Sequence, residues 1–176
     1  MELTNKRIAF LVGPGFEDLE FWVPFMRLQE AGAEVVAVGI KAGDVYQSKH
    51  GCLSAAADVG AGDVNANDFD AVIIPGGWAP DKLRRYDSVR DFVWRMNDLG
   101  KTVGMICHAG LVGISANIVA GHRATGSLGI KDDLENAGAV WVDAPAFRDG
   151  NQVWGRVVAD IPAFNRELIA ALSSRE

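Results

Sequence analysis

The stretch Val103-Gly104-Met105-Ile106-Cys107-His108-Ala109-Gly110 passes from an unbroken apolar run to a polar pair and then to residues compatible with a helix. Unbroken apolar runs are typical of strands that are covered on both faces, as in a parallel sheet. A strand that turns sharply into a helix has the geometry of a nucleophile elbow, although the letters differ from Gly-x-Ser-x-Gly. The stretch therefore predicts an α/β fold with Cys107 at the carboxyl end of a central strand.

The same arrangement repeats on both sides of this stretch. Three more apolar runs occur, at 8–12, 35–38 and 71–74, and apolar residues at helical spacing predict helices over 19–31, 82–99 and 161–172. Strands that alternate with helices form a sheet covered on two faces. We therefore expect one doubly wound α/β domain over residues 1–176, with about six or seven strands.

Two segments interrupt this alternation. Scattered Gly, Ala, Asp and Asn residues over 43–67 predict a hairpin or an irregular excursion at a sheet edge. Near the end of the chain, apolar pieces at 139–142, 146–147 and 153–154 predict short strands, and Asp149-Gly150-Asn151 supplies a turn between the last two.

The composition excludes several classes of protein. Of the 176 residues, 49% are hydrophobic, 23% charged and 9% aromatic, which excludes a disordered chain, a fibrous repeat and a small disulfide scaffold. The net charge is −6, and no cluster of basic residues occurs beyond the short group Lys82, Arg84 and Arg85. Nucleic acid is therefore not an expected partner.

The ends and the cysteines give expectations about location and cofactors. Only five apolar residues, 8–12, follow the basic start, too few for a signal peptide or a membrane span, so we expect a cytoplasmic protein with no membrane partner. Cys52 and Cys107 form no CxxC pair or zinc-type cluster, so we expect neither a disulfide nor a metal, and we assign Cys52 a structural role. The Gly13-Pro14-Gly15 turn lacks the third glycine of a dinucleotide fingerprint, so no cofactor is expected.

Cys107 has two possible roles. At a helix N-terminus the free N–H groups favour anions, which lowers a thiol pKa from about 8.5 to between about 3.5 and 7.5 and would make Cys107 a thiolate nucleophile. The same N–H groups could bind the oxyanion that forms when sulfur attacks a carbonyl. Alternatively, Cys107 is a small buried residue that closes the strand.

Glu17 also has two possible roles. It follows a Gly-Pro-Gly turn after another predicted strand, so it could reach Cys107 and act as a general acid or base. Partial burial next to a thiolate would raise the pKa of such a carboxyl. Alternatively, Glu17 is an ordinary acid at a helix start, like Asp18 or Glu20.

The sequence resembles the PfpI/ThiJ superfamily over nearly its full length, especially the PfpI-type intracellular cysteine proteases and their glyoxalase-like or deglycase-like relatives. The residues that carry the resemblance are Gly15-Phe16-Glu17-Asp18-x-Glu20, Phe69-Asp70-Ala71, Pro75-Gly76-Gly77, Ala79-Pro80-Asp81, Ile106-Cys107-His108, Asp132-Asp133-Leu134-x-Asn136-Ala137-Gly138, Trp141-Val142-Asp143 and Asp160-x-Pro162-Ala163-Phe164.

The resemblance implies a flavodoxin-like three-layer sandwich of the glutamine amidotransferase type, with a mainly parallel central sheet. It implies that Cys107 is the nucleophile and that Glu17 is the carboxylate in contact with it. It places Gly76, Gly77 and His108 at the substrate and oxyanion site, with backbone N–H groups of Gly77 and His108 as the donors.

The resemblance further implies that His108 pairs with an acid from a neighbouring subunit, and the matching position is Asp81. We therefore expect a homo-oligomer, a dimer or a hexamer. Whether His108 polarises Cys107 depends on geometry, because consecutive side chains at a sharp turn usually diverge. His108 could instead support the backbone.

Departures from the family pattern affect the expected function. The chain has Cys107-His108-Ala109-Gly110 where Cys-His-Gly-Pro is common, Asp81 where glutamate is expected, and Trp78 after the two glycines. We therefore expect a cysteine enzyme that acts on a small carbonyl or amide-like substrate by glyoxalase, deglycase or hydrolase chemistry. The alternatives are a PfpI-like cysteine peptidase that cleaves a peptide substrate, and a redox-sensing stress protein or holdase in which Cys107 is oxidised to a sulfinate.

Overall fold

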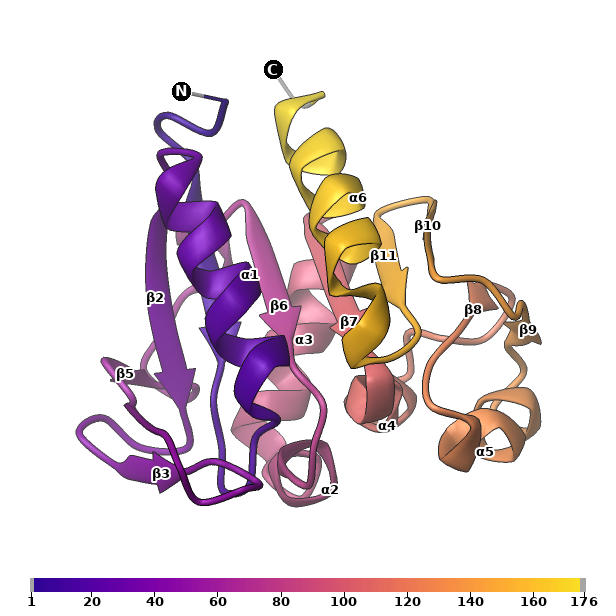
Figure 1. Cartoon of the computed structure of the whole chain (residues 1–176), viewed down its shortest axis with the longest axis horizontal. Coiled ribbons are helices and arrows are strands. Elements are labelled where there is room, and N and C mark those ends of the chain that lie inside the picture. Colours follow the sequence, from indigo (N-terminus) through magenta and orange to yellow (C-terminus); the bar gives the residue numbers. More distant parts are fainter. Residues whose placement is uncertain (1, 175–176) are drawn as a thin grey trace.

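The computed structural model describes residues 2–174 and arranges them in three layers (Figure 1). The middle layer is a seven-stranded sheet with the order β10-β11-β7-β6-β1-β2-β5, in which every neighbouring pair is parallel except β10 and β11. Its strands are β1 (Arg7–Leu11), β2 (Glu34–Gly39), β5 (Val59–Gly60), β6 (Ala71–Ile74), β7 (Thr102–Ile106), β10 (Ala146–Asp149) and β11 (Gln152–Gly155). The predicted doubly wound, mainly parallel fold is confirmed.

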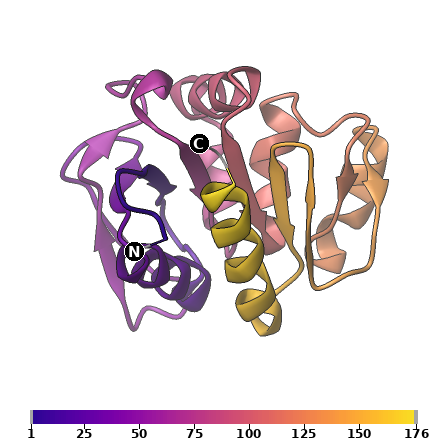
Figure 2. The same ribbon diagram turned by 90° about the horizontal axis from the view of Figure 1, so that it is seen from above.

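Helices form the two outer layers. They are α1 (Asp18–Glu30), α2 (Ala79–Leu83), α3 (Asp87–Asp98), α4 (Gly110–Ser115), α5 (Lys131–Asn136) and α6 (Ile161–Ser173). Helices α1 and α6 lie together on one face of the sheet, and α3 and α4 cover the other (Figures 1 and 2). Short 3-10 turns are η1 (Ala66–Asp68), η2 (Cys107–Ala109), η3 (Leu128–Ile130) and η4 (Val158–Asp160).

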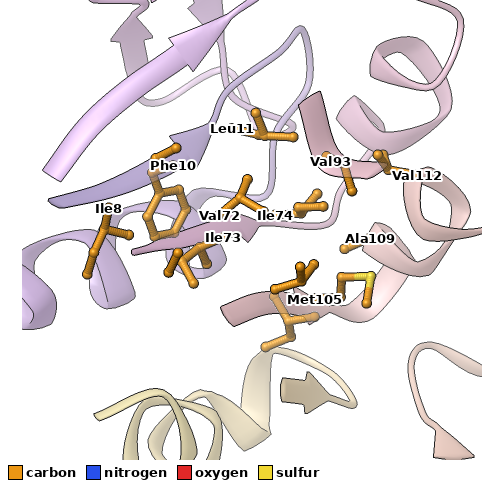
Figure 3. Close-up of a cluster of buried hydrophobic side chains, with 14 of the residues drawn as sticks. Ile8, Phe10, Leu11, Val72, Ile73, Ile74, Val93, Met105, Ala109 and Val112 are labelled. Atoms are coloured by element: carbon orange, nitrogen blue, oxygen red, sulfur yellow. The ribbon is translucent and has the colours of Figure 1, made fainter. Parts of the chain in front are cut away.

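The core forms because the central strands bury both of their faces (Figure 3). Phe10 of β1 packs edge-on against Phe21 of α1, with ring centroids 5.0 Å apart. Its sheet neighbour Ile73 lies on the same face, beside Gly104 of β7. A Cβ at Gly104 would lie 2.8 Å from the side chains of Ile73 and Leu168, so glycine lets α6 pack closely on the sheet.

The strand order sets the place where a ligand can bind. The chain passes from β1 outward to β2 on one side and returns to β6 on the other, so the order reverses between β1 and β6. In open α/β sheets ligands bind beyond the carboxyl ends of the strands at such a reversal. The segments that leave β1, β6 and β7 therefore meet at one edge of the sheet.

Two predicted segments differ in detail from the sequence analysis. The segment 43–67 contains the antiparallel hairpin β3 (Val45–Gln47) and β4 (Ser54–Ala56), as predicted, and then the edge strand β5. The single helix predicted over 82–99 is wrong, because α2 ends at Leu83 and α3 begins at Asp87. Arg90 stabilises the break, because its side chain donates a 2.8 Å hydrogen bond to the Arg84 carbonyl, which has lost its helical partner.

The remaining elements lie at the far edge of the molecule. Strands β8 (Arg123–Ala124) and β9 (Val140–Trp141) pair in parallel beside α5, apart from the main sheet. Among the described helices, none combines the length and apolar character that crossing a membrane requires.

Phe10→Ala tests the packing of the core. Removing a buried phenylalanine leaves a cavity, so we expect the free energy of unfolding to fall by about 3–5 kcal/mol in urea titrations. Leu19→Ala on the exposed side of α1 is the control and should change it by less than about 0.5 kcal/mol. Equal losses in the two variants would contradict this description of the core.

Candidate active site

Cys107 lies at the sharp turn between β7 and the helical segment that follows it. Its backbone is in the left-handed region, with φ +61°, which is costly for a residue other than glycine and is typical of strained functional sites. The turn is tied down by Ser127, whose N–H donates to the Cys107 carbonyl at 3.1 Å. The side chain is half-buried, so its sulfur is not sealed in the core.

His108 turns back toward the sulfur. Its Nδ1 lies 3.3 Å from Cys107 Sγ, so these consecutive side chains converge. Burial, and then the positive charge of Lys49, lower the pKa of His108 below its usual value. The imidazole is therefore neutral at neutral pH, and it can accept a proton or donate its own.

The backbone N–H groups of Gly77 and of His108 lie beside the sulfur, where they favour the thiolate and act to lower the Cys107 pKa. Gly77 has φ +78°, and a Cβ there would lie 2.5 Å from the Glu17 nitrogen and the Gly15 carbonyl oxygen. Only glycine fits this position. The predicted donor pair is therefore present, and it can stabilise negative charge on the sulfur or on an oxyanion beside it.

The carboxyl next to Cys107 belongs to Glu20, in the first turn of α1. Glu20 is fully buried, and its Oε2 accepts a 2.8 Å hydrogen bond from the Gly76 N–H. Within residues 2–174, Oε1 accepts no hydrogen bond. A Cβ at Gly76 would lie 2.5 Å from Glu20 Oε2 and 2.7 Å from the Cys107 Cβ, so glycine allows the carboxyl and the thiol to meet.

Glu20 and Cys107 oppose each other's ionisation. Burial, and then the charge of Glu17, raise the pKa of Glu20 to about 7. Burial, and then the charge of an ionised Glu20, raise the pKa of Cys107 to about 12. The lowered thiol pKa that the sequence led us to expect from the helix N-terminus is therefore wrong beside an ionised Glu20. The pair therefore carries at most one negative charge until the pH is strongly alkaline.

The predicted role of Glu17 is wrong. Its Oε2 accepts hydrogen bonds of 2.9 Å from the N–H groups of Leu19 and Glu20, so it caps the N-terminus of α1. The cap holds the first turn in which Glu20 lies. Gly76 lies at the site as predicted, and its N–H donates to the Glu20 carboxylate.

Asp81 and Cys52 lie outside this cluster. Asp81 is exposed on α2 and pairs with Arg85 of the same chain, so its pairing with His108 of another subunit stays a prediction. Cys52 is exposed in the loop of the β3–β4 hairpin, with Sγ 3.7 Å from the His50 carbonyl. Its predicted structural role is wrong, because the side chain is exposed and does not pack in the core.

Glu17, Asp18 and His50 hold potential metal ligands within 4.8 Å of one another. These ligand atoms already have partners within the protein. Glu17 caps α1, and Asp18 accepts a hydrogen bond from Ser48 Oγ (2.5 Å) and pairs with His50 Nδ1 (2.8 Å). The cluster therefore serves to tie the segment 48–50 to the start of α1.

The site geometry agrees with the comparison to known proteins, in which residues 6–171 match the model of the DJ-1/PfpI family. The chain belongs to this family. The resemblance predicted from the sequence is therefore confirmed, and with it the flavodoxin-like sandwich.

Relatives of the chain include named enzymes. It is 40% identical over 166 residues to a deglycase of Pyrococcus abyssi, covering 94% of this chain and 99% of that one. It is 36% identical over 171 residues to protein/nucleic acid deglycase 2 of Escherichia coli, covering 97% and 99%. A two-domain Anabaena variabilis protein with DJ-1/ThiJ/PfpI-like and ferritin-like domains matches with TM-score 0.94 and 38% identity, over 96% of this chain but 48% of that one.

A helical phase argument could have found Glu20. Side chains in the first turn of a helix point back toward its N-terminus. The side chain of the third residue after the cap therefore faces the ends of the strands. If Glu17 is the cap, that residue is Glu20. Without the cap, Glu17 and Glu20 are equivalent acids at a helix start, and Glu17 lies nearer the turn.

Glu20→Gln tests the raised carboxyl pKa. The folded protein keeps the Glu20 proton up to about pH 7, whereas the unfolded chain releases it near 4.5, so this proton stabilises the fold below pH 4.5 and its contribution is lost as the pH rises to about 7. Between pH 4.5 and 7 the wild-type unfolding free energy should fall by up to about 3 kcal/mol relative to the variant. Parallel pH profiles of the two proteins in urea would contradict the assignment.

Proposed function

We propose that the protein is a cysteine-dependent deglycase that acts on small adducts of 2-oxoaldehydes. The observation that carries the proposal is the convergence of the Cys107 sulfur, the Glu20 carboxyl and His108 Nδ1 with two backbone N–H donors at one edge of the sheet. Relatives named as deglycases, 36–40% identical over nearly the whole chain, support it.

We place the single negative charge of the pair on the sulfur, although an ionised Glu20 would raise the thiol pKa. Cys107 is half-buried and receives the N–H groups of Gly77 and His108, whereas Glu20 is fully buried and its Oε1 accepts no hydrogen bond from the described residues. A buried oxygen without a donor favours the protonated carboxyl. The reactive form is therefore a thiolate beside a neutral acid, formed when the pair loses its first proton.

This form supplies the steps of deglycation. The thiolate attacks the carbon that carries the hydroxyl and the bound amine, the carbon–nitrogen bond breaks, and Glu20 gives its proton to the departing amine. The Glu20 carboxylate then moves a proton from that carbon to the neighbouring carbonyl carbon by way of an enediol, with Gly77 and His108 stabilising the oxyanion. One carbon is oxidised and its neighbour reduced, so no external oxidant is needed. Water cleaves the resulting thioester, which releases a 2-hydroxy acid and restores the thiolate.

The partial burial of Cys107 favours a small substrate. A peptidase needs an extended cleft beside its nucleophile, whereas a 2-oxoaldehyde adduct needs only a few atoms to reach the sulfur.

Turnover of a methylglyoxal–amine adduct tests the proposal, with release of the amine and formation of the 2-hydroxy acid as the two readouts. We expect kcat/KM to rise with pH and to level off above about 7, as the pair loses its first proton. Cys107→Ser should abolish turnover, and Glu20→Gln should lower it at least about 100-fold.

Glu17→Gln is the matched control. It should keep most of the turnover and move the rising limb to lower pH, because it removes a negative charge that raises the Glu20 pKa. Turnover that survives in Cys107→Ser, or peptide hydrolysis without amine release, would refute the deglycase. Peroxide oxidation of Cys107 to a sulfinate without any turnover would favour the redox sensor.

We also propose that the active form is a homo-oligomer in which Asp81 of a neighbouring subunit orients His108. The family resemblance and the exposure of Asp81 on α2 support this arrangement. The neutral His108 then has a partner that fixes its tautomer.

Asp81→Asn should lower kcat about tenfold or more, because it removes the orienting charge. Asp87→Asn is the control, since Asp87 is also exposed and paired with an arginine on its own helix. Light scattering on the wild-type protein gives the oligomer size. A monomer with full turnover would remove Asp81 from the mechanism.

A further inference from the structure

One lysine stands at the mouth of the Cys107 site on a segment that is fixed to it. Lys49 follows the β3 strand, and its N–H donates a 2.7 Å hydrogen bond to the Phe16 carbonyl. On either side, Ser48 and His50 bind the Asp18 carboxylate, at 2.5 and 2.8 Å. These contacts attach the lysine to the loop that leaves β1 and leads into α1.

Trp78 lies beneath this lysine. It directly follows the N–H donor Gly77, and its own N–H donates a 2.8 Å hydrogen bond to the Gly15 carbonyl. Because Gly15 has no side chain, the Trp78 side chain fits against it, with its Cβ 3.0 Å from the position that a Gly15 Cβ would occupy. The Lys49 ammonium lies 4.8 Å from the centre of the exposed indole ring.

The Lys49 charge is directed at the site and is not neutralised by an ion pair. Among residues 2–174, the salt bridges include thirteen pairs, and Lys49 is in none of them. Its charge also lowers the pKa of Glu20 and of His108, so the ammonium faces both groups. An ammonium that is unpaired, exposed and held over an aromatic ring can bind an anion.

We propose that Lys49, held over the Trp78 ring, is an anion subsite of the Cys107 site, and that the site prefers electrophiles that carry a carboxylate near the reacting carbon. The choice of substrate class rests on the proposed deglycase function. The substrates of this class are 2-oxoaldehyde adducts of free amino acids or of other small carboxylates, in preference to neutral adducts.

The first test uses iodoacetate and iodoacetamide, which differ in one charged group. Each forms a bond from the Cys107 sulfur to its methylene carbon and releases iodide, so no turnover is needed. Peptide mass spectrometry separates modification of Cys107 from that of Cys52. Lys49→Met should lower the ratio of the iodoacetate to the iodoacetamide rate at Cys107 roughly two- to fivefold, the range of exposed ion pairs.

Two controls separate a subsite from a general charge effect. Lys49→Arg keeps the charge and should keep the ratio. Lys101→Met removes the same net charge at the opposite end of β7 and should also keep it. A change in thiol reactivity alone affects both reagents and cancels in the ratio. An unchanged ratio in Lys49→Met, or an equal fall in Lys101→Met, would overturn the subsite.

The second test concerns the substrate class. The methylglyoxal–amine adducts of glycine and of glycinamide differ only in the carboxylate. Wild type should show the higher kcat/KM with the carboxylate adduct, and Lys49→Met should remove this preference while Lys49→Arg retains it. Turnover without a preference refutes the proposed substrate class. Absence of turnover of either adduct in the wild type refutes the deglycase function instead, and the alkylation ratio then decides the subsite by itself.

Discussion

The site depends on the contact between a fully buried carboxyl, Glu20, and a half-buried thiol, Cys107. Two ionised groups in contact with so little water are unfavourable, so the pair holds at most one negative charge until the pH is strongly alkaline. The backbone around them favours the sulfur as its carrier, because the Gly77 and His108 N–H groups lie beside it and Glu20 Oε1 has no described donor. Loss of one proton from the pair thus produces both the thiolate nucleophile and the neutral carboxyl that donates a proton.

The fold creates this contact from three separate segments. Strands β1, β6 and β7 end at the same edge of the sheet, and the chain that leaves each of them supplies one part of the site. The Glu17 cap sets the first turn of α1, and Gly76 removes the side chain that would separate carboxyl from thiol. The strained backbone of Cys107 is kept by the buried strand before it and by the Ser127 hydrogen bond after it. Stability elsewhere in the core therefore maintains the strain at the site.

Local signals in the sequence were enough for most of the fold. Unbroken apolar runs predicted the four central strands. A strand that is buried on both faces is apolar at every position, so it can be recognised from its own residues alone. The Cys107 elbow followed from where a strand ends, whereas the Gly77 donor was implied by the family resemblance. The break between α2 and α3 was not predicted. It is stabilised by a hydrogen bond from the Arg90 side chain, which lies several residues after the break. Glu17 was chosen over Glu20 because the choice depends on helix phase, which is fixed by a cap that only the three-dimensional structure shows.

Thiolate absorbance of Cys107, followed against pH in a Cys52→Ser background, tests the central claim most directly. If the single charge lies on sulfur, the absorbance appears together with the first proton lost from the pair, well below strongly alkaline pH. If it lies on Glu20, no thiolate forms until strongly alkaline pH, in line with a thiol pKa of about 12 beside an ionised carboxylate. That second result would contradict the account of the nucleophile given above.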